Sequence, residues 1–187
     1  LGDLGSLNLD LFKTFTFRTI QTASFRLTIL NVFSIVCQRC HLNVLEGISR
    51  SIAPTMIELA LKQSILQAPS MQCLFFCFQR SQSFDAIEAT QRKDIIQALF
   101  QMSIDIIDKQ LKSSAPVEKE ETSILRLTSL KLITAIVTLD EKDNILEKAL
   151  SPSDIKKWHT TLYGIANMDE SEEMRALGSK LIASLSH

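Results

Sequence analysis

Four cysteines, set in two pairs, are the residues of this chain whose type and spacing could most readily do chemistry. The first pair forms the string Cys37-Gln38-Arg39-Cys40-His41, which has the C-x-x-C-H spacing of c-type haem attachment. Attachment also requires exposed thiols, a second axial ligand and an export pathway, whereas this string ends an apolar helical stretch. We therefore predict no haem at these cysteines.

The second pair, Cys73 and Cys77, brings the number of thiolates to that of a four-cysteine zinc site. Both cysteines lie in a run of leucine and phenylalanine, without the glycines and polar residues that surround zinc-binding cysteines. We favour buried, reduced thiols that pack as small apolar side chains, and we predict no metal and no other cofactor. Cysteines without a secretory leader also indicate a reducing compartment, cytoplasmic or nuclear.

Nucleophilic catalysis would need a histidine beside a serine or cysteine, and only His41, His159 and His187 are available. His187 is terminal, and His159 follows Trp158 on an amphipathic segment where packing or surface placement explains it. The sequence contains no nucleophile elbow, Walker A motif, dinucleotide-binding glycine motif or H-E-x-x-H motif. We predict that the chain is not an enzyme and has no small-molecule substrate.

Helical periodicity dominates the segments that must position these residues. Apolar residues make up 45% of the chain and charged residues 22%, with few glycines and prolines. This composition is typical of a globular helical domain. The predicted helices cover a weak stretch within residues 1–13, then 20–40, 44–67, 70–84, 91–113, 122–138 and 140–150. Alternating β-branched residues leave a strand open over 14–19 and 122–138, although the acids that begin the latter favour a buried helix.

Two of these helices have distinctive apolar patterns, and two prolines are expected to interrupt the series. Residues 70–84 are apolar nearly all round, which predicts burial on several sides. Residues 91–113 carry two neighbouring stripes, which indicate contact with two helices: Ile95, Leu99, Met102 and Ile106 in one, and Ile96, Phe100, Ile107 and Leu111 in the other. Pro54 is expected to kink or begin its helix, and Pro69 to mark a break.

The net charge of −1 carries no message about nucleic acid or anionic membranes. The most apolar run, Ile29 to Cys37, is interrupted by Asn31 and Ser34, so no membrane insertion is predicted. We predict a single all-α domain over residues 1–187, with a surface loop or hinge at 113–121. Because the chain begins at Leu1, we expect it to be a C-terminal piece of a larger protein.

The C-terminal stretch predicts two short helices joined by an acidic turn. Ser151, Pro152 and Asp154 have the types expected at a helix start. Asp169 is expected to cap the second helix, with Glu172 completing a capping box. The apolar positions are Ile155, Trp158, Leu162 and Ile165 in the first helix, and Met174, Leu177, Leu181 and Leu185 in the second.

This pair, over residues 152–185, resembles the second half of a HEAT repeat, a helical repeat of armadillo type. In that family an acid in the turn and an apolar–arginine pair at the start of the second helix form a ladder between repeats. Asp169 and Met174-Arg175 stand at those places. The resemblance implies an all-α fold: a short, irregular α-solenoid of antiparallel helix pairs, with a closed helical bundle as the alternative.

Stacked helix pairs generate extended surfaces without a catalytic cleft. The resemblance therefore implies a non-catalytic scaffold for protein–protein interaction, a segment of a helical-repeat subunit of a larger complex. The alternative is a nucleic-acid-associated helical-repeat protein, such as a ribosome or chromatin assembly factor. We expect protein partners to be contacted through the C-terminal pair, at Asp169, Arg175 and Ile182.

Overall fold

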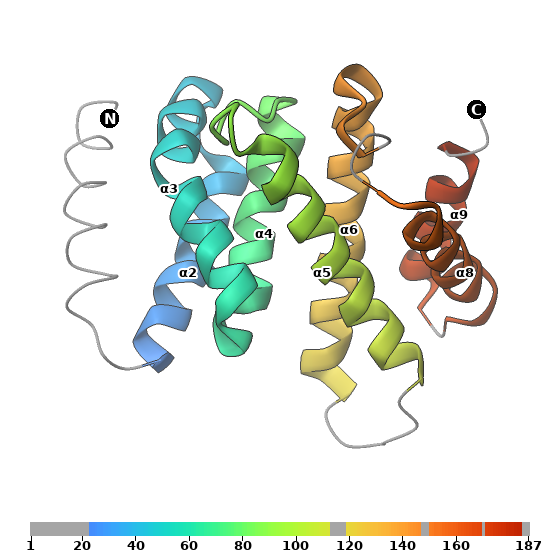
Figure 1. The fold of residues 1–187 in the computed structure, drawn as a ribbon. Coiled ribbons are helices and arrows are strands. Elements are labelled where there is room, and N and C mark those ends of the chain that lie inside the picture. The colour runs from blue at the N-terminus through green and yellow to red at the C-terminus, as the bar shows by residue number, and fades with distance from the viewer. Residues whose placement is uncertain (1–22, 113–118, 147–149, 170, 185–187) are drawn as a thin grey trace. The chain divides into compact units, whose positions relative to one another are not determined.

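The computed structural model describes residues 23–112, 119–146, 150–169 and 171–184. Within these ranges the chain forms seven α-helices and no strand, which confirms the all-α prediction (Figure 1). The chain divides into two compact units, Leu1–Ile95 and Ile96–His187. The predictions for residues 1–13 and 14–19, and for most of the hinge at 113–121, lie outside the described residues; residues 119–121 begin a helix.

The first unit contains α2 (Ala23–Arg39), α3 (Leu42–Lys62) and α4 (Ser64–Ser81). Helix α4 packs against both α2 and α3 (Figure 1). Since it has a neighbour on two sides, it needs apolar residues around most of its circumference. Its buried side chains confirm the prediction of burial on several sides: Leu66, Met71, Cys73, Leu74, Cys77 and Phe78.

The predicted break at Pro69 is wrong, because the chain turns at Gln63 instead. Gln63 has an extended backbone between α3 and α4, and Pro69 lies inside α4, where it is buried. The turn is held by Gln67, whose Nε2 donates to the carbonyl of Ala60 at 2.9 Å in the last turn of α3. A proline inside a helix removes one backbone hydrogen bond, and α4 nevertheless continues through Pro69. Pro54 also lies inside a helix, on the exposed side of α3, so the prediction that a helix begins there is wrong.

The second unit contains most of α5 (Arg92–Lys112), α6 (Lys119–Asp143), α8 (Pro152–Met168) and α9 (Glu172–Ser184). Helix α9 packs against α8 and α6. The Phe100 and Trp158 rings meet edge to face with centroids 4.7 Å apart, and Lys157 Nζ lies 2.6 Å from Asp105 Oδ1. An aromatic contact and an ion pair therefore connect α5 to α8.

The apolar stripes of α5 differ in burial. Ile96, Phe100 and Ile107 of the second stripe are buried, as predicted. In the first stripe only Leu99 is buried, while Ile95, Met102 and Ile106 are half-buried. The core side of α5 is therefore centred on the second stripe and Leu99.

Helix α6 confirms the helical alternative for residues 122–138. Helix α6 continues to Asp143 and Ile145 and Leu146 are helical again, so the helix predicted from Asp140 starts later than expected; residues 147–149 of that prediction lie outside the described residues. Between the two helical stretches, Asn144 takes a left-handed backbone with φ 49°. Asparagine tolerates this conformation better than most residues. The buried carboxylate of Asp140 accepts hydrogen bonds from the backbone N–H groups of Ile145 and Leu146, at 2.6 and 3.0 Å.

The start of α8 follows its sequence signals. Ser151 Oγ accepts from the N–H of Asp154 at 3.3 Å, and the Asp154 carboxylate accepts from the N–H of Ser151 at 3.1 Å. Pro152 occupies the first turn, where its missing N–H has no helical partner to lose. No helix in the described part of the chain is long and apolar enough to cross a membrane.

Candidate functional site

Three cysteines gather where α2 packs on α4. Cys37 lies in the last turn of α2, and Cys73 and Cys77 lie one turn apart on α4. Cys77 Sγ is 4.0 Å from Cys37 Sγ, and Cys73 Sγ is 3.7 Å from the carbonyl oxygen of Leu30. All three thiols are buried. Two sulfurs this close leave no room for a water molecule between them.

Arg80, on α4, holds the end of α2 beside these thiols. Its Nη1 donates to the carbonyl of Cys37 at 2.7 Å, and its Nη2 to the carbonyl of Cys40 at 2.5 Å. Carbonyls at the C-terminus of a helix lack partners within the helix, so Arg80 caps α2 from a neighbouring element. The same guanidinium lies 3.9 Å from Cys40 Sγ, and Cys40 is half-buried.

The surroundings of Cys37 favour its thiolate. Hydrogen bonds from the thiols of Cys73 and Cys77, together with the charge of Arg80, lower the pKa of Cys37 to about 5, and burial opposes them. Hydrogen bonding to Cys37, together with burial, raises the pKa of Cys73 and that of Cys77 above the ordinary thiol value. The cluster thus favours one thiolate on Cys37 beside two neutral thiols.

The negative end of the α2 dipole also opposes a thiolate in the last turn, and the Arg80 cap counters it. Cys73 has a single proton to donate. In the neutral cluster that proton is given to Leu30, and it is available to Cys37 once Cys37 has ionised.

The sequence predicted reduced thiols packed as apolar side chains, and all four cysteines are free, three of them buried. It did not predict that the two pairs meet. Among the described residues, no three histidine, cysteine or acidic side chains are arranged to hold a metal ion. His41 of the C-x-x-C-H string is exposed and precedes α3 without a side-chain capping bond.

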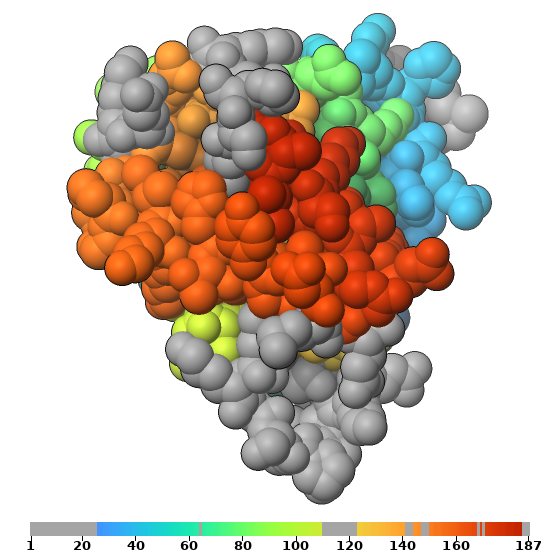
Figure 2. All heavy atoms as spheres, turned by 90° about the vertical axis from the view of Figure 1, so that its right-hand side faces the viewer, coloured from blue at the N-terminus to red at the C-terminus, as the bar shows by residue number. Residues whose placement is uncertain are grey.

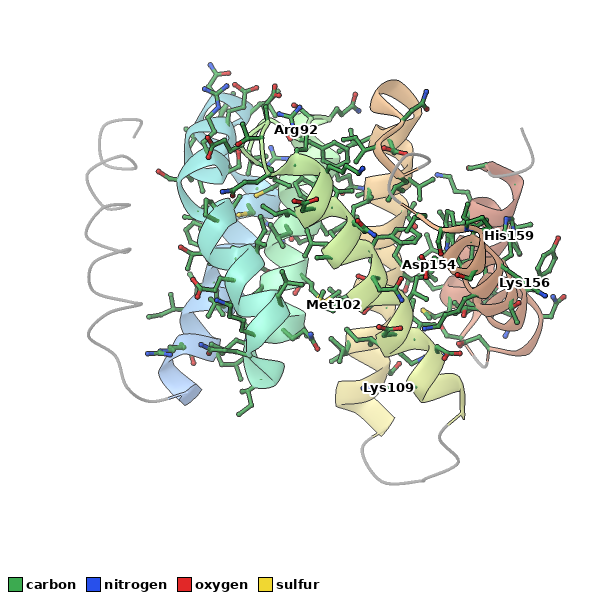
Figure 3. All side chains as sticks on the ribbon, viewed as in Figure 1. Arg92, Met102, Lys109, Asp154, Lys156 and His159 are labelled. Atoms are coloured by element: carbon green, nitrogen blue, oxygen red, sulfur yellow. The ribbon has the colours of Figure 1, made fainter. Side chains whose placement is uncertain are left out.

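The other histidines do not join this cluster. His159 lies on α8 near Lys156 (Figure 3), half-buried, with its ring 6.1 Å from that of Trp158. This placement agrees with the packing or surface placement predicted for His159. His187 lies outside the described residues.

An exposed apolar ridge occupies another side of α2. Val32, Ile35 and Val36 are 55%, 53% and 36% exposed, and their spacing of three and four residues places them on one face of the helix. Leu30, Phe33 and Cys37 are buried. We call the three exposed residues the α2 ridge. Helix α2 therefore has apolar residues both toward α4 and toward the outside.

Asp169 is placed differently from the prediction, which made it the N-cap of the last helix. It is the C-cap of α8, and Ser171 takes the N-cap position: Ser171 Oγ accepts from the N–H of Met174 at 3.4 Å. Asp169 Oδ1 accepts from the N–H of Ser171 at 2.9 Å. Its Oδ2 forms an ion pair with Arg126 of α6, and its side chain is only 2% exposed. A buried carboxylate needs such partners.

Arg175 belongs to the same turn, because its Nη1 donates to the carbonyl of Asp169 at 2.6 Å. Ile182 is half-buried on α9. Figure 2 shows α9 lying beside α8, against which it packs. On the predicted stripe of α9, Met174 and Leu181 are buried, Leu177 is half-buried, and Leu185 lies outside the described residues. Asp169 and Arg175 thus make contacts within the chain, and contact with a partner at these three residues stays a prediction.

Arg126 is the residue that the sequence analysis missed at this turn. A signal for it exists: Leu125-Arg126 repeats the apolar–arginine pair Met174-Arg175, and Lys131 and Lys180 follow at the same distance in the two helices. Lys131 Nζ lies 2.8 Å from Glu173 Oε1, so α6 and α9 share a second ion pair. Aligning the two helices would have brought Arg126 to notice.

No protein-family model matches the chain, and neither a curated protein nor a solved structure shows significant similarity to it. The resemblance to HEAT repeats is therefore neither supported nor contradicted by known proteins.

Proposed function

We propose that this chain is a non-catalytic helical-repeat module that binds other proteins, and that the α2 ridge is its main binding surface. The observation that carries the proposal is the exposure of three large aliphatic side chains on one face of a single helix. Burying a side chain of this size against a partner contributes about 1.5–3 kcal/mol. Contiguous exposed apolar residues are a usual mark of a protein interaction site.

The occupant that fits this ridge is an amphipathic helix of another protein. Side chains at i, i+3 and i+4 form the type of ridge that packs into the groove of a second helix. Helix α2 contains no acidic residue, and Arg39 in its last turn is three residues beyond Val36 of the ridge. A complementary helix would therefore carry an apolar stripe flanked by aspartate or glutamate.

Helical-repeat architecture is supported by the recurrence of the apolar–arginine pair in α6 and α9. In both helices the arginine contacts Asp169: Arg126 pairs with the carboxylate and Arg175 donates to the carbonyl. A polar turn shared by successive helix pairs is what the HEAT resemblance implies. The solenoid arrangement and the role of a subunit within a larger complex are part of this proposal.

Nucleic-acid association is the alternative class, and the ion pairs disfavour it. Lys131, Lys157 and Arg126 each lie within ion-pair distance of an acid. Acids set among the cations reduce the positive potential that a phosphate backbone requires. A protein partner is therefore the better supported proposal.

Site-specific photo-crosslinking tests this function. A photoreactive amino acid is placed at Ile35 in the full chain, and as a matched control at Glu46, an exposed residue of α3 in the same unit. After irradiation in cells, mass spectrometry identifies the cross-linked peptides. We expect adducts from Ile35 that concentrate on one helical segment with acids beside an apolar stripe, and none of these from Glu46.

Three results would overturn the proposal. Adducts from Ile35 to this chain's own peptides within one molecule would mean that the chain covers its own ridge. Adducts to a second copy of the chain would mean self-association. The same set of adducts from Ile35 and Glu46 would mean that the ridge has no selective partner.

A further inference from the structure

Cys37 and Cys77 combine proximity with placement on two different helices. Their sulfurs are 4.0 Å apart, both side chains are buried, and the two residues belong to helices packed against each other. A disulfide requires a separation of about 2.05 Å. The sulfurs must therefore approach by about 2 Å, with nothing to displace between them.

The two thiols also differ in chemical character. Cys37 accepts from the Cys77 thiol and has the charge of Arg80 nearby, bound to its own carbonyl, so it is the member that ionises, while Cys77 stays protonated. The thiolate is the form that attacks peroxides. A nucleophilic thiolate beside a neutral second thiol is the arrangement in which an oxidised sulfur is captured by its neighbour.

We propose that Cys37 and Cys77 form a reversible redox pair that a hydroperoxide, such as hydrogen peroxide, converts to a disulfide joining α2 to α4. In the first step the Cys37 thiolate attacks a peroxide oxygen. The S–O bond forms, the O–O bond breaks, and the leaving hydroxide takes a proton to become water. Sulfur is oxidised to the sulfenic acid and the peroxide is reduced.

In the second step Cys77 sulfur attacks the sulfenic sulfur of Cys37. The S–S bond forms, the S–O bond breaks, and the hydroxyl leaves as water with the proton of Cys77. The sum is two thiols and one hydrogen peroxide giving one disulfide and two waters. A dithiol reductant reverses the reaction by thiol–disulfide exchange.

The last turn of α2, which Arg80 caps, is the route by which a small oxidant reaches the buried Cys37 thiol. The bonds from Arg80 to the carbonyls of Cys37 and Cys40 close the end of α2, and Cys40 beside them is only half-buried. Fraying of this last helical turn exposes Cys37 without unfolding the unit, since helix ends open at low cost. Cys73, the third thiol, supports the thiolate and is the competing partner.

Trypsin places Cys37, Cys40 and the pair on α4 on three different peptides, so a linkage between them can be mapped. Cys37 falls alone on residues 27–39, Cys40 alone on 40–50, and Cys73 and Cys77 together on 63–80. The full-length chain is treated with hydrogen peroxide, its remaining thiols are alkylated, and the digest is mapped by mass spectrometry with and without dithiothreitol. We expect a reducible linkage between 27–39 and 63–80, with fragment ions placing it on Cys77.

Two variants assign the partner. Cys73→Ala should keep the linkage, whereas Cys77→Ala should lose it and leave a sulfenic acid on Cys37 that dimedone labels. Circular dichroism checks that each variant is folded. If a variant does not fold, the fragment ions of the wild-type peptides still show which cysteine is linked to Cys37. Linkage through Cys73, linkage of 27–39 to 40–50, or oxidation confined to Cys40 would each overturn the proposal.

Discussion

Gly178 is the position where a single added carbon tests the packing of α9 against α8. A Cβ built there would lie 3.1 Å from Ile165 Cγ2 and 3.2 Å from the backbone nitrogen of Ala166. The second contact is to backbone, which cannot rotate away, so the two helices must separate by a few tenths of an ångström. Gly47 in α3 is the matched control, because a Cβ there meets nothing within 4 Å.

The two substitutions should change the free energy of unfolding differently. Replacing glycine by alanine in an exposed helix interior stabilises by about 0.5–1 kcal/mol, and Gly47→Ala should show this gain. Gly178→Ala has the same helical gain, but overpacking between helices costs about 1–3 kcal/mol. We expect Gly178→Ala to be neutral to destabilising, by up to about 2 kcal/mol, once the gain is subtracted.

Urea denaturation of both variants gives the overall change, and amide hydrogen exchange shows whether the loss is confined to α8 and α9. The second readout is needed because a chain with two units need not unfold in one step. If Gly178→Ala stabilises the chain as much as Gly47→Ala does, α9 does not approach α8 as described.

Three further predictions concern the core, the buried ion pair and the thiol cluster. Leu99→Ala should destabilise by about 2–5 kcal/mol and Ile106→Ala by clearly less, because Leu99 is fully buried and Ile106 half-buried; equal urea midpoints would contradict this. Arg126→Ala should cost about 3 kcal/mol by leaving the Asp169 carboxylate buried without its cation, and adding Asp169→Asn should recover part of the loss in the same assay. Because the pKa of Cys37 is lowered to about 5 from an ordinary value of 9.0, its thiolate contributes stability that is complete above pH 9 and is lost as the pH falls toward 5. The free energy of unfolding of the wild type should therefore fall more than that of Cys37→Ala between pH 9 and pH 5. Parallel curves of unfolding free energy against pH would refute the thiolate.

Most of the helices were predicted from local sequence signals, namely apolar spacing and capping residues. The Ser151 capping box lies within four residues, so its partners are visible in the sequence itself. The core stripe of α5 was likewise set by helical spacing. The turn between α3 and α4 was misplaced because it depends on a side-chain contact between the two helices, from Gln67 to the carbonyl of Ala60, and because Pro69 lies buried inside α4.

The cysteines of the candidate site could be picked out from the sequence, but their meeting in space could not be predicted from it. Both cysteine pairs stand out in the sequence, but the distance between Cys37 and Cys77 depends on how α2 packs on α4, which no local pattern specifies. Asp169 shows the same limit: its place in the turn was predicted, while its partner Arg126 lies 43 residues earlier in the chain. The exposure of the α2 ridge also needed the structure, because Val32 and Leu30 are both aliphatic and only packing tells them apart.

The proposed function is tested most directly by measuring how tightly the partner helix, identified by cross-linking from Ile35, binds to variants of this chain at Ile35. A synthetic peptide of that helix is titrated against wild type, Ile35→Lys, Ile35→Asp and the control Glu46→Lys, at low and high salt. Because the partner helix would bury the Ile35 side chain, its loss should raise Kd about tenfold or more in both Ile35 variants. The aspartate should weaken binding further by repelling the acids of the peptide, and salt should narrow that difference. Equal affinity of wild type and both Ile35 variants would contradict the account.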